Sequence, residues 1–453
     1  MSCQLSRREL LKASTVAGAG ALFLPRNILA QGESPNEKLD VALIGLGNQG
    51  GFQVGGMEQT RQNVVALCDV DDRMVNQRKA AEKFPGAKRF YDFRQMYDEM
   101  LEKIDAVCVS TPDHTHYHPA IFAIRAKKHV YLEKPMAHSV AECRIITEEA
   151  AKYGVATQLG CQRHTIPNMA RVVELVKGGA IGEVREVYSW FGGDRGMPAL
   201  PEKEATAPAE LKWDLWLGPA ADRPYAVSVV NGKADQPTYA PYNWRFWWDF
   251  GTGETGNWAC HILDIPYWAL DLKYPIKVAA TGPEIDEQRT PKEMHCTFVY
   301  PERGDLPGVT LYWSHTKNPP CKAKYELKNE YEGGIKFGHM NNLFVGSKGM
   351  LLAGFDKHVL LPEENFADFK VPEPTIPKSP GFHREWIDAC KGGTPATCNF
   401  SYSGPMAETA ILGNTAYRAG RKSFDWDAEK MVAVDCPEVQ AALKPEFKKG
   451  WAY

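Results

Sequence analysis

Three glycines at a characteristic spacing are the first residues of this sequence whose arrangement suggests chemistry. They lie in the run Gly45-Leu-Gly-Asn-Gln-Gly50, directly after the apolar stretch 41–44. Gly45 permits a tight turn, Gly47 lets bare backbone approach a pyrophosphate, and Gly50 lets the following helix pack close to the strand. The N-terminus of that helix offers unpaired N–H groups and a partial positive charge to phosphate. The run therefore predicts a dinucleotide-binding turn.

A carboxylate stands where the ribose of such a dinucleotide would lie. Asp69 ends a second apolar stretch, 64–68, nineteen residues after Gly50. A carboxylate at this position accepts hydrogen bonds from the ribose hydroxyls of NAD and repels the 2′-phosphate of NADP. Arg73, four residues on, could still accommodate a phosphate. We therefore expect NAD, with NADP as the open alternative, and expect Asn48 and Gln49 of the turn to contact it.

Lys134 and His261 have the chemistry that alcohol oxidation requires. The O–H proton must leave while hydride passes to a nicotinamide, and histidine is the most common general base near neutral pH. A lysine ammonium can hold the alcohol oxygen and stabilise negative charge that develops on it. Lys134 follows the apolar residues 130–132 at the carboxyl end of a predicted parallel strand, where ligands bind in such sheets. The alternatives are a core histidine for His261 and a surface charge for Lys134.

Aromatic and polar residues beside these two suit a sugar. Trp244 and Arg245 precede His261 by a short Gly-rich link, and an aromatic face next to polar groups fits the C–H faces and hydroxyl edges of a pyranose. Arg163 and His164 follow Gln162 after the last strand of the predicted parallel sheet, and they are further candidates to reach the substrate. Core packing or a domain interface is the alternative for each.

The stretch Asp113-His-Thr-His-Tyr-His118 places three histidines at alternating positions. Such a set could suggest zinc. However, alternate residues of a loop need not converge on one point, and this loop joins a strand to a helix that is predicted to start at Pro119. In a doubly wound sheet such loops line the cofactor, so we expect His116 at the cofactor and no metal.

Strands and helices alternate from residue 38 to about 160, which predicts a doubly wound parallel sheet, the Rossmann arrangement. Helices are expected at 72–83, 93–103, 119–126 and 139–153. After residue 182 the predicted strands, 184–191, 276–281, 295–300, 309–314 and 343–345, have no helix between each pair. They favour an α+β domain with a largely antiparallel sheet that is open on one face, closed by helices at 382–391 and 404–419. The Pro- and Trp-rich segment 196–250 is expected to be a long functional connection.

The N-terminus predicts export. Arg7 and Arg8 precede an uncharged stretch, 13–24, which is too short to span a bilayer, and a plausible cleavage site follows Ala30. This pattern is typical of a twin-arginine (Tat) signal peptide, so the Tat machinery is an expected partner and the periplasm the expected location. Removing residues 1–30 changes the net charge from −3 to −6. That balance argues against a nucleic-acid or anionic-membrane partner.

Several motifs in order resemble one family. They are the glycine turn, Thr111-Pro112-x-x-x-His116, Glu133-Lys134-Pro135 and the run 253–264, which contains Asn257, His261 and Asp264. Together they resemble the glucose–fructose oxidoreductase / inositol dehydrogenase (Gfo/Idh/MocA) family from about residue 38 to the C-terminus. The resemblance implies a bound nicotinamide dinucleotide and substrates that are sugars or polyols. It implies cofactor contacts from Thr111, Pro112, His116, Glu133, Lys134 and Gln162.

The family's Lys-Asp-His trio corresponds to Lys134, Asn257 and His261, so this chain has an amide where a carboxylate is usual. Asn257 and Asp264 are expected at the substrate. An amide cannot raise the basicity of an imidazole as a carboxylate does, so His261 is expected to stay mostly neutral.

These observations predict a tripartite chain: a signal peptide at 1–30, an NAD(P)-binding Rossmann domain at 38–160, and an α+β substrate and oligomerisation domain at 161–453. The expected function is NAD(P)-dependent hydride transfer with a secondary alcohol or ketone of a sugar derivative. The alternatives are a glycosidase or lyase that oxidises the sugar transiently, and a non-catalytic sugar-binding protein. We expect tight cofactor binding, because the periplasm has no nicotinamide pool, and a homo-oligomer formed through the open sheet.

Overall fold

The computed structural model of this chain describes residues 37–451, so the predicted signal peptide lies outside the described residues. Of the described residues, 39–451 belong to one compact unit. Among the helices of the described part, none is both long and apolar enough to cross a bilayer.

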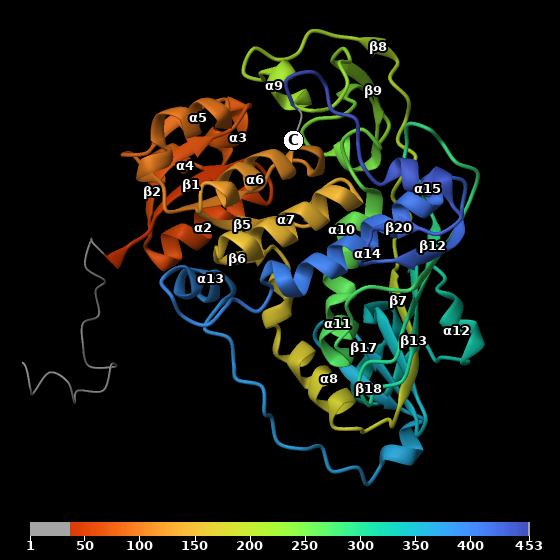
Figure 1. The fold of residues 1–453 in the computed structure, drawn as a ribbon. Helices are drawn as coiled ribbons and strands as arrows, with labels where there is room; N and C mark the ends of the chain where they lie inside the picture. Colours follow the sequence, from red (N-terminus) through yellow and green to blue (C-terminus); the bar gives the residue numbers. More distant parts are fainter. Residues whose placement is uncertain (1–36, 452–453) are drawn as a thin grey trace, which may run out of the picture. The chain divides into compact units, whose positions relative to one another are not determined.

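The first part of this unit is the doubly wound sheet that the sequence predicted. Six parallel strands lie in the order β3-β2-β1-β4-β5-β6, and helices cover both faces (Figure 1). The strands are β1 (Asp40–Ile44), β2 (Asn63–Cys68), β3 (Lys88–Phe90), β4 (Ala106–Val109), β5 (His129–Leu132) and β6 (Thr157–Leu159). Strands β1, β4 and β5 are almost entirely buried, as their continuous apolar runs require.

The helices of this part largely follow the predicted pattern. They are α2 (Gly50–Thr60), α3 (Asp72–Gln77), α4 (Ala80–Lys83), α5 (Phe93–Met100), α6 (Tyr117–Arg125) and α7 (Val140–Tyr153). The helix expected at 72–83 was wrong as a single element. Lys79 takes a left-handed conformation, with φ 51°, which separates α3 from α4. In contrast, Ser139 begins α7 with the capping box that Glu142 completes.

The second part contains a nine-stranded sheet in the order β18-β17-β16-β7-β13-β12-β11-β19-β20. Only the β7–β13 pair is parallel among these strands, so the sheet is largely antiparallel as predicted. Its strands are β7 (Val184–Phe191), β11 (Lys277–Thr281), β12 (Met294–Tyr300), β13 (Val309–His315), β16 (Asn342–Gly346), β17 (Met350–Ala353), β18 (His358–Leu361), β19 (Ser423–Asp427) and β20 (Val432–Ala433).

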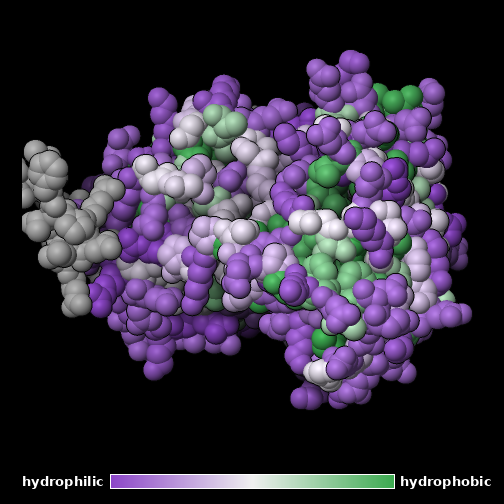
Figure 2. Space-filling model, turned by 90° about the horizontal axis from the view of Figure 1, so that it is seen from below, coloured by the Kyte–Doolittle hydropathy of each residue, from purple (hydrophilic) through white to green (hydrophobic). Residues whose placement is uncertain are grey.

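One face of this sheet packs on helices α8 (Pro167–Lys177), α10 (Gly253–Ile262), α11 (Asp264–Leu270) and α14 (Phe400–Arg418) (Figure 1). The other face is partly covered by an excursion, residues 319–340, that contains α12 (Pro320–Lys324). Tyr331 and Phe337 of the excursion form an apolar cluster with Tyr188 and Leu343 of the sheet. Figure 2, which views the molecule from below, shows hydrophobic residues among hydrophilic ones in the right half, the half that holds this sheet. Assembly through the remaining open face stays a prediction.

Segment 196–250, which we call the cap segment, is more than the connection that the sequence suggested. It holds β8 (Lys203–Glu204), α9 (Trp213–Leu217), β9 (Ala226–Val230) and β10 (Lys233–Pro237), and its three strands form a sheet of their own. A separate apolar cluster, which includes Trp216, Tyr239 and Trp247, packs inside it. The tryptophans therefore form a hydrophobic core within the cap segment. The sequence did not indicate this core because the segment shows neither helical nor alternating hydrophobic periodicity.

A buried ion pair joins the two parts of the fold. Arg144 on α7 donates to both carboxylate oxygens of Glu408 on α14, at 2.8 Å each.

Substituting Glu408→Leu leaves the arginine charge buried without its partner. We expect the free energy of unfolding to fall by about 3–5 kcal/mol, measured by denaturant titration. Glu148→Gln is the matched control: Glu148 lies 3.8 Å from the same arginine with a side chain that is 67% exposed. It is expected to cost less than about 1 kcal/mol. Equal losses would contradict a joining role for the buried pair.

Candidate active site

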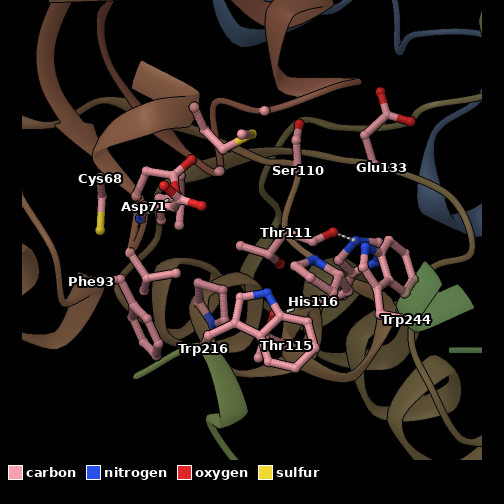
Figure 3. Close-up of a pocket in the computed structure, with 18 of the residues that line it drawn as sticks. Cys68, Asp71, Phe93, Ser110, Thr111, Thr115, His116, Glu133, Trp216 and Trp244 are labelled. Carbon is pink, nitrogen blue, oxygen red and sulfur yellow. Dashed lines mark hydrogen bonds between the residues drawn. The ribbon is translucent and has the colours of Figure 1, made fainter. Parts of the chain in front are cut away.

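A deep pocket opens at the carboxyl ends of the parallel strands. Residues from the glycine turn, from Asp69 and from Lys134 all line it (Figure 3). Gly45 has φ 81°, and a Cβ there would meet the Ser110 carbonyl at 2.6 Å. A Cβ on Gly50 would meet the Gly45 oxygen at 2.2 Å, so this glycine lets α2 approach the strand. The turn has the geometry that a pyrophosphate site needs.

Two carboxylates line the pocket beyond the end of β2. Asp69 accepts hydrogen bonds from the backbone N–H groups of Leu46 (2.6 Å) and Asp71 (2.9 Å), while burial raises its pKa to about 6. Asp71 is paired with Arg73, whose guanidinium donates to both carboxylate oxygens at 2.8 and 2.6 Å. Arg73 is therefore engaged by a neighbouring carboxylate, which leaves this end of the pocket better suited to free ribose hydroxyls than to a 2′-phosphate.

Four buried polar atoms in the pocket wall have no hydrogen-bond partner in the described structure. One is Arg245 Nε of the cap segment, residues 196–250, and the other three are Ser110 Oγ, Thr111 Oγ1 and Glu133 Oε2 of the parallel-sheet part. Buried polar groups are normally paired, so unpaired ones that face a pocket indicate the place of a ligand. The positions of the latter three at the ends of β4 and β5, together with the glycine turn and Asp69, fit a nicotinamide dinucleotide.

The cap segment closes this pocket from the opposite side. Figure 3 shows Trp216 and Trp244 of the cap segment across the pocket from Ser110 and Glu133. Backbone bonds fix the cap segment beside the ribose end: Lys212 N donates to the Val70 oxygen at 2.9 Å, and Asp71 forms a β-bridge with Leu211. Trp244 and Arg245, which were predicted at the sugar, thus line the cofactor pocket.

The three alternating histidines bind three different parts of the chain rather than one metal. His114 lies 3.1 Å from the Trp216 oxygen and 3.3 Å from the Phe250 oxygen, both of the cap segment. His116 contacts the Pro135 and Thr111 oxygens at 2.7 and 2.8 Å, and His118 contacts the Trp451 oxygen at 2.8 Å. Of these, His116 lines the cofactor pocket.

Lys134 connects the Rossmann sheet to α10. Its ammonium donates to Asn257 Oδ1 at 2.8 Å, and Asn257 Nδ2 donates to Glu254 Oε2 at 3.0 Å. Glu254 is buried and forms an ion pair with Arg195. Burial, and then the nearby charge of Arg245, lower the pKa of Lys134. The sequence predicts an influence of Asn257 on His261, but the amide oxygen accepts its hydrogen bond from the lysine instead.

His261 lies one turn beyond Asn257 on α10. Burial lowers its pKa well below the usual value, and the positive charges of Lys134 and Arg163 lower it further. Its Nδ1 has no hydrogen-bond partner among the described residues. The imidazole is therefore neutral at pH 7, which leaves one ring nitrogen free to accept a proton.

Six predicted site residues outside the glycine turn do not line this pocket: Gln162, Arg163, His164, Asn257, His261 and Asp264. Gln162, expected at the cofactor, donates to Glu133 Oε1 at 2.7 Å and so positions that carboxylate. His164 and Asp264, expected at the substrate, are buried and bonded to each other at 2.9 Å. Tyr402 also donates to Asp264, at 2.6 Å. The His164–Asp264 pair comes close to Cys398 in a possible metal-ligand group, but these bonds already satisfy it as a core pair.

Two contributors were missed by reading the sequence. Glu254 sits in the same run as Asn257, and its position three residues earlier on a helix was an available signal. Arg195 lies 59 residues before its partner Glu254, in a stretch without periodicity, and gave no signal.

The fold and the pocket define the class of this protein as a two-part α/β dinucleotide-binding protein. Residues 39–161 match the family model described as "Oxidoreductase family, NAD-binding Rossmann fold" (GFO_IDH_MocA). The chain is 28% identical over 200 residues to a glycosyl hydrolase family 109 protein of Solibacter usitatus, covering 40% of this chain and 44% of that protein. It is 30% identical over 145 residues to the myo-inositol 2-dehydrogenase of Thermotoga maritima, covering 32% and 42%. The matches thus span about half the length of these curated relatives or less.

Solved structures extend the likeness in fold to the second part of the chain. The WlbA dehydrogenase from Bordetella pertussis, in complex with NADH and UDP-GlcNAcA, is similar with a TM-score of 0.56 at 15% identity, over 86% of this chain and 98% of that one. A levoglucosan dehydrogenase in complex with NADH and levoglucosan gives 0.54 at 16%, over 86% and 99%. The family model thus describes the Rossmann part of the chain, and the solved structures show that the likeness in fold covers both parts.

Asp69 is expected to set the cofactor preference. Asp69→Ser removes the charge that repels a 2′-phosphate and weakens the bonds to the ribose hydroxyls. We expect the ratio of NADP to NAD affinity to rise by at least about 10-fold, measured by titration of apo-protein. Asp92→Asn, which removes one charge from the same pocket rim, should leave the ratio unchanged. Tighter binding of NADP than NAD by the unaltered protein would overturn this assignment.

Asn257 is expected to set the pH dependence through Lys134. In Asn257→Asp the hydrogen-bond acceptor becomes a carboxylate, which favours the ammonium form of Lys134 and raises its pKa. The same negative charge favours the protonated form of the nearby His261 and raises its pKa as well. The acidic limb of the oxidation profile, which requires a neutral His261, and the alkaline limb, which requires a protonated Lys134, should therefore both move to higher pH, by about 1 unit or more. Asn257→Leu, which removes the bond without adding charge, is the control and should move neither limb upward. An active Asn257→Asp variant with an unchanged profile would show that this position does not influence the titrating group.

Proposed function

We propose that this protein is an NAD(P)-dependent oxidoreductase that transfers hydride between a tightly held nicotinamide cofactor and a secondary alcohol or ketone of a sugar derivative. The observation that carries the proposal is the position of Lys134. It lines the dinucleotide pocket, and its ammonium is bonded to Asn257, one turn from an unpaired and neutral His261.

Each residue then has one task in the oxidation of the alcohol. The bound cofactor supplies the hydride acceptor. Lys134, fixed by Asn257, donates a hydrogen bond to the alcohol oxygen and stabilises negative charge there as the C–H bond breaks. His261 accepts the hydroxyl proton on its free ring nitrogen, and in the reverse direction it returns that proton. Glu254, paired with Arg195, holds the amide of Asn257 so that its oxygen faces Lys134.

Retention of the cofactor is the second element of the proposal. The cap segment covers the pocket, and its backbone bonds at Val70 and Asp71 must break before the ribose end can open. Tat transport carries folded proteins, so a chain with a twin-arginine leader can cross the membrane with its dinucleotide already bound. The proposed location is accordingly the periplasm, with the hydride returned within the same site by a second substrate or by the first.

A second candidate function uses the same site. A sugar hydroxyl is oxidised, the acidified neighbouring C–H bond allows a leaving group to depart, and the hydride is then given back. The likeness to a glycosyl hydrolase family 109 protein favours it. The two candidates differ in product, because the first yields a keto sugar and the second a released aglycone. A protein that binds sugars without turnover yields neither.

The cofactor is expected to remain with the protein through purification. The purified chain is dialysed extensively and denatured, and the released dinucleotide is assayed, with an expected stoichiometry near one per chain. His114→Leu removes both contacts of that imidazole with the cap segment, so this variant should lose cofactor faster on dialysis. His358→Leu is the control, because it removes a histidine contact on β18 with Asn168 Oδ1, at 2.6 Å, and neither residue lines the cofactor pocket. An empty protein that needs millimolar NAD for activity would contradict retention and, with it, export of a loaded enzyme.

A further inference from the structure

A second cavity, which we call the basic pocket, lies beside α10 at the ends of β7 and β16. Its wall includes Arg163, Lys317, Lys322, His339, Trp258 and Phe355. No aspartate or glutamate occurs among the described residues that line it. A concave site with several basic side chains, aromatic walls and no acid favours a ligand with negative charge.

The Arg163 guanidinium differs from the two lysines of this pocket because its N–H groups have no hydrogen-bond partner in the described part of the chain. Its guanidinium lies 4.3 Å from the centre of the Phe355 ring and 5.4 Å from that of Trp258. No hydrogen bond or ion pair joins it to any residue in the described part of the chain. The two rings hold the planar group in place, while its N–H donors stay available to a ligand. By comparison, Lys317 is already paired with Asp194 at 2.6 Å, and Lys322 donates to Asn329 Oδ1 at 2.7 Å.

The basic pocket adjoins the proposed reaction centre through α10. Trp258 directly follows Asn257, the residue bonded to Lys134, and its ring centre lies 6.0 Å from that of His261. Trp258 also stacks on Phe191, at 4.7 Å, which fixes the orientation of the indole. A ligand that lies across Trp258 therefore reaches from Arg163 towards the side of α10 that carries Asn257 and His261.

From this geometry we infer that the substrate is a sugar acid, such as a hexuronic acid or its glycoside, whose carboxylate binds the Arg163 guanidinium. The inference rests on the proposed function for the position of the reacting carbon. The planar fork of an arginine matches a carboxylate through two parallel hydrogen bonds, and the aromatic wall of the basic pocket suits the C–H groups of a pyranose. A phosphorylated sugar is also an anion, and it is the alternative that the experiment distinguishes.

The test compares matched sugars on the purified holoprotein. The methyl glycosides of glucose and galactose are titrated beside the corresponding methyl uronosides and glucose 6-phosphate, with binding followed by calorimetry and turnover by cofactor absorbance. We expect at least one uronoside to bind about 10- to 100-fold more tightly than its neutral partner, with an affinity that falls as salt is added. Arg163→Gln should remove that difference and change the affinity for the neutral glycoside less than about 2-fold.

Two further variants separate the charge from its geometry and from a loss of folding. Arg163→Lys keeps the charge without the planar fork, so it should retain part of the preference. Arg185→Gln is the control, because Arg185 lies on β7 with an exposed side chain paired with Glu183. It should bind uronosides as the unaltered protein does.

The outcomes discriminate between this inference and the proposed function. If neutral glycosides bind and are oxidised as well as the acids, the sugar-acid inference is overturned and the oxidoreductase stands. If a uronoside binds through Arg163 without any change in the cofactor, the inference stands and the proposed chemistry fails. If glucose 6-phosphate binds more tightly than the uronosides, the sugar-acid inference is overturned in favour of a sugar phosphate. If no charged sugar binds, the assignment of the basic pocket to an anionic substrate is rejected.

Discussion

The hydrogen bond between Lys134 and Asn257 is the constraint on which the arrangement of this protein depends. The lysine follows β5 of the Rossmann sheet by two residues, and the amide lies on α10, which packs against the nine-stranded sheet. A neutral oxygen as partner holds the ammonium in place without adding a negative charge to its surroundings. Burial and the charge of Arg245 lower the pKa of Lys134. A neutral amide partner leaves this pKa lower than a carboxylate partner would.

The rest of the site continues this connection outward. Asn257 is oriented by Glu254, and Glu254 is balanced by Arg195, so one chain of polar contacts runs from the strand end to the start of the cap segment. Near the same strand ends, Asp113 accepts two hydrogen bonds from Thr252, at 3.1 and 2.6 Å, just before α10 begins. These contacts fix α10 relative to the dinucleotide pocket, which is what positions His261. A buried network of this kind imposes a single geometry because each member is costly to leave unpaired.

The cap segment gives the pocket a character that the Rossmann sheet alone does not have. Its own apolar cluster makes it a folded unit, and its contacts with His114, Val70 and Asp71 attach it to the loops that follow β4 and β2. A cofactor below such a cover exchanges only when the cover opens, and the cost of opening includes several backbone hydrogen bonds. The same walls also shape what can approach Lys134, because residues of the cap segment and Lys134 line one pocket.

The sequence by itself determined the local features, and the tertiary structure decided the partners. Strand β7 has the predicted bounds, and the turn at Gly45 and the capping of α7 by Ser139 follow from their sequences, because turn chemistry and side-chain periodicity act within a few residues. Lys134 and Asp69 could be placed at the pocket because the carboxyl ends of parallel strands share one edge. The partner of Asn257, the inward pairing of His164 with Asp264 and the folding of the cap segment over the pocket could not be predicted. These depend on contacts between residues 100 or more positions apart, such as the 123 that separate Lys134 from Asn257, and no local pattern specifies which distant groups the packed domains bring together.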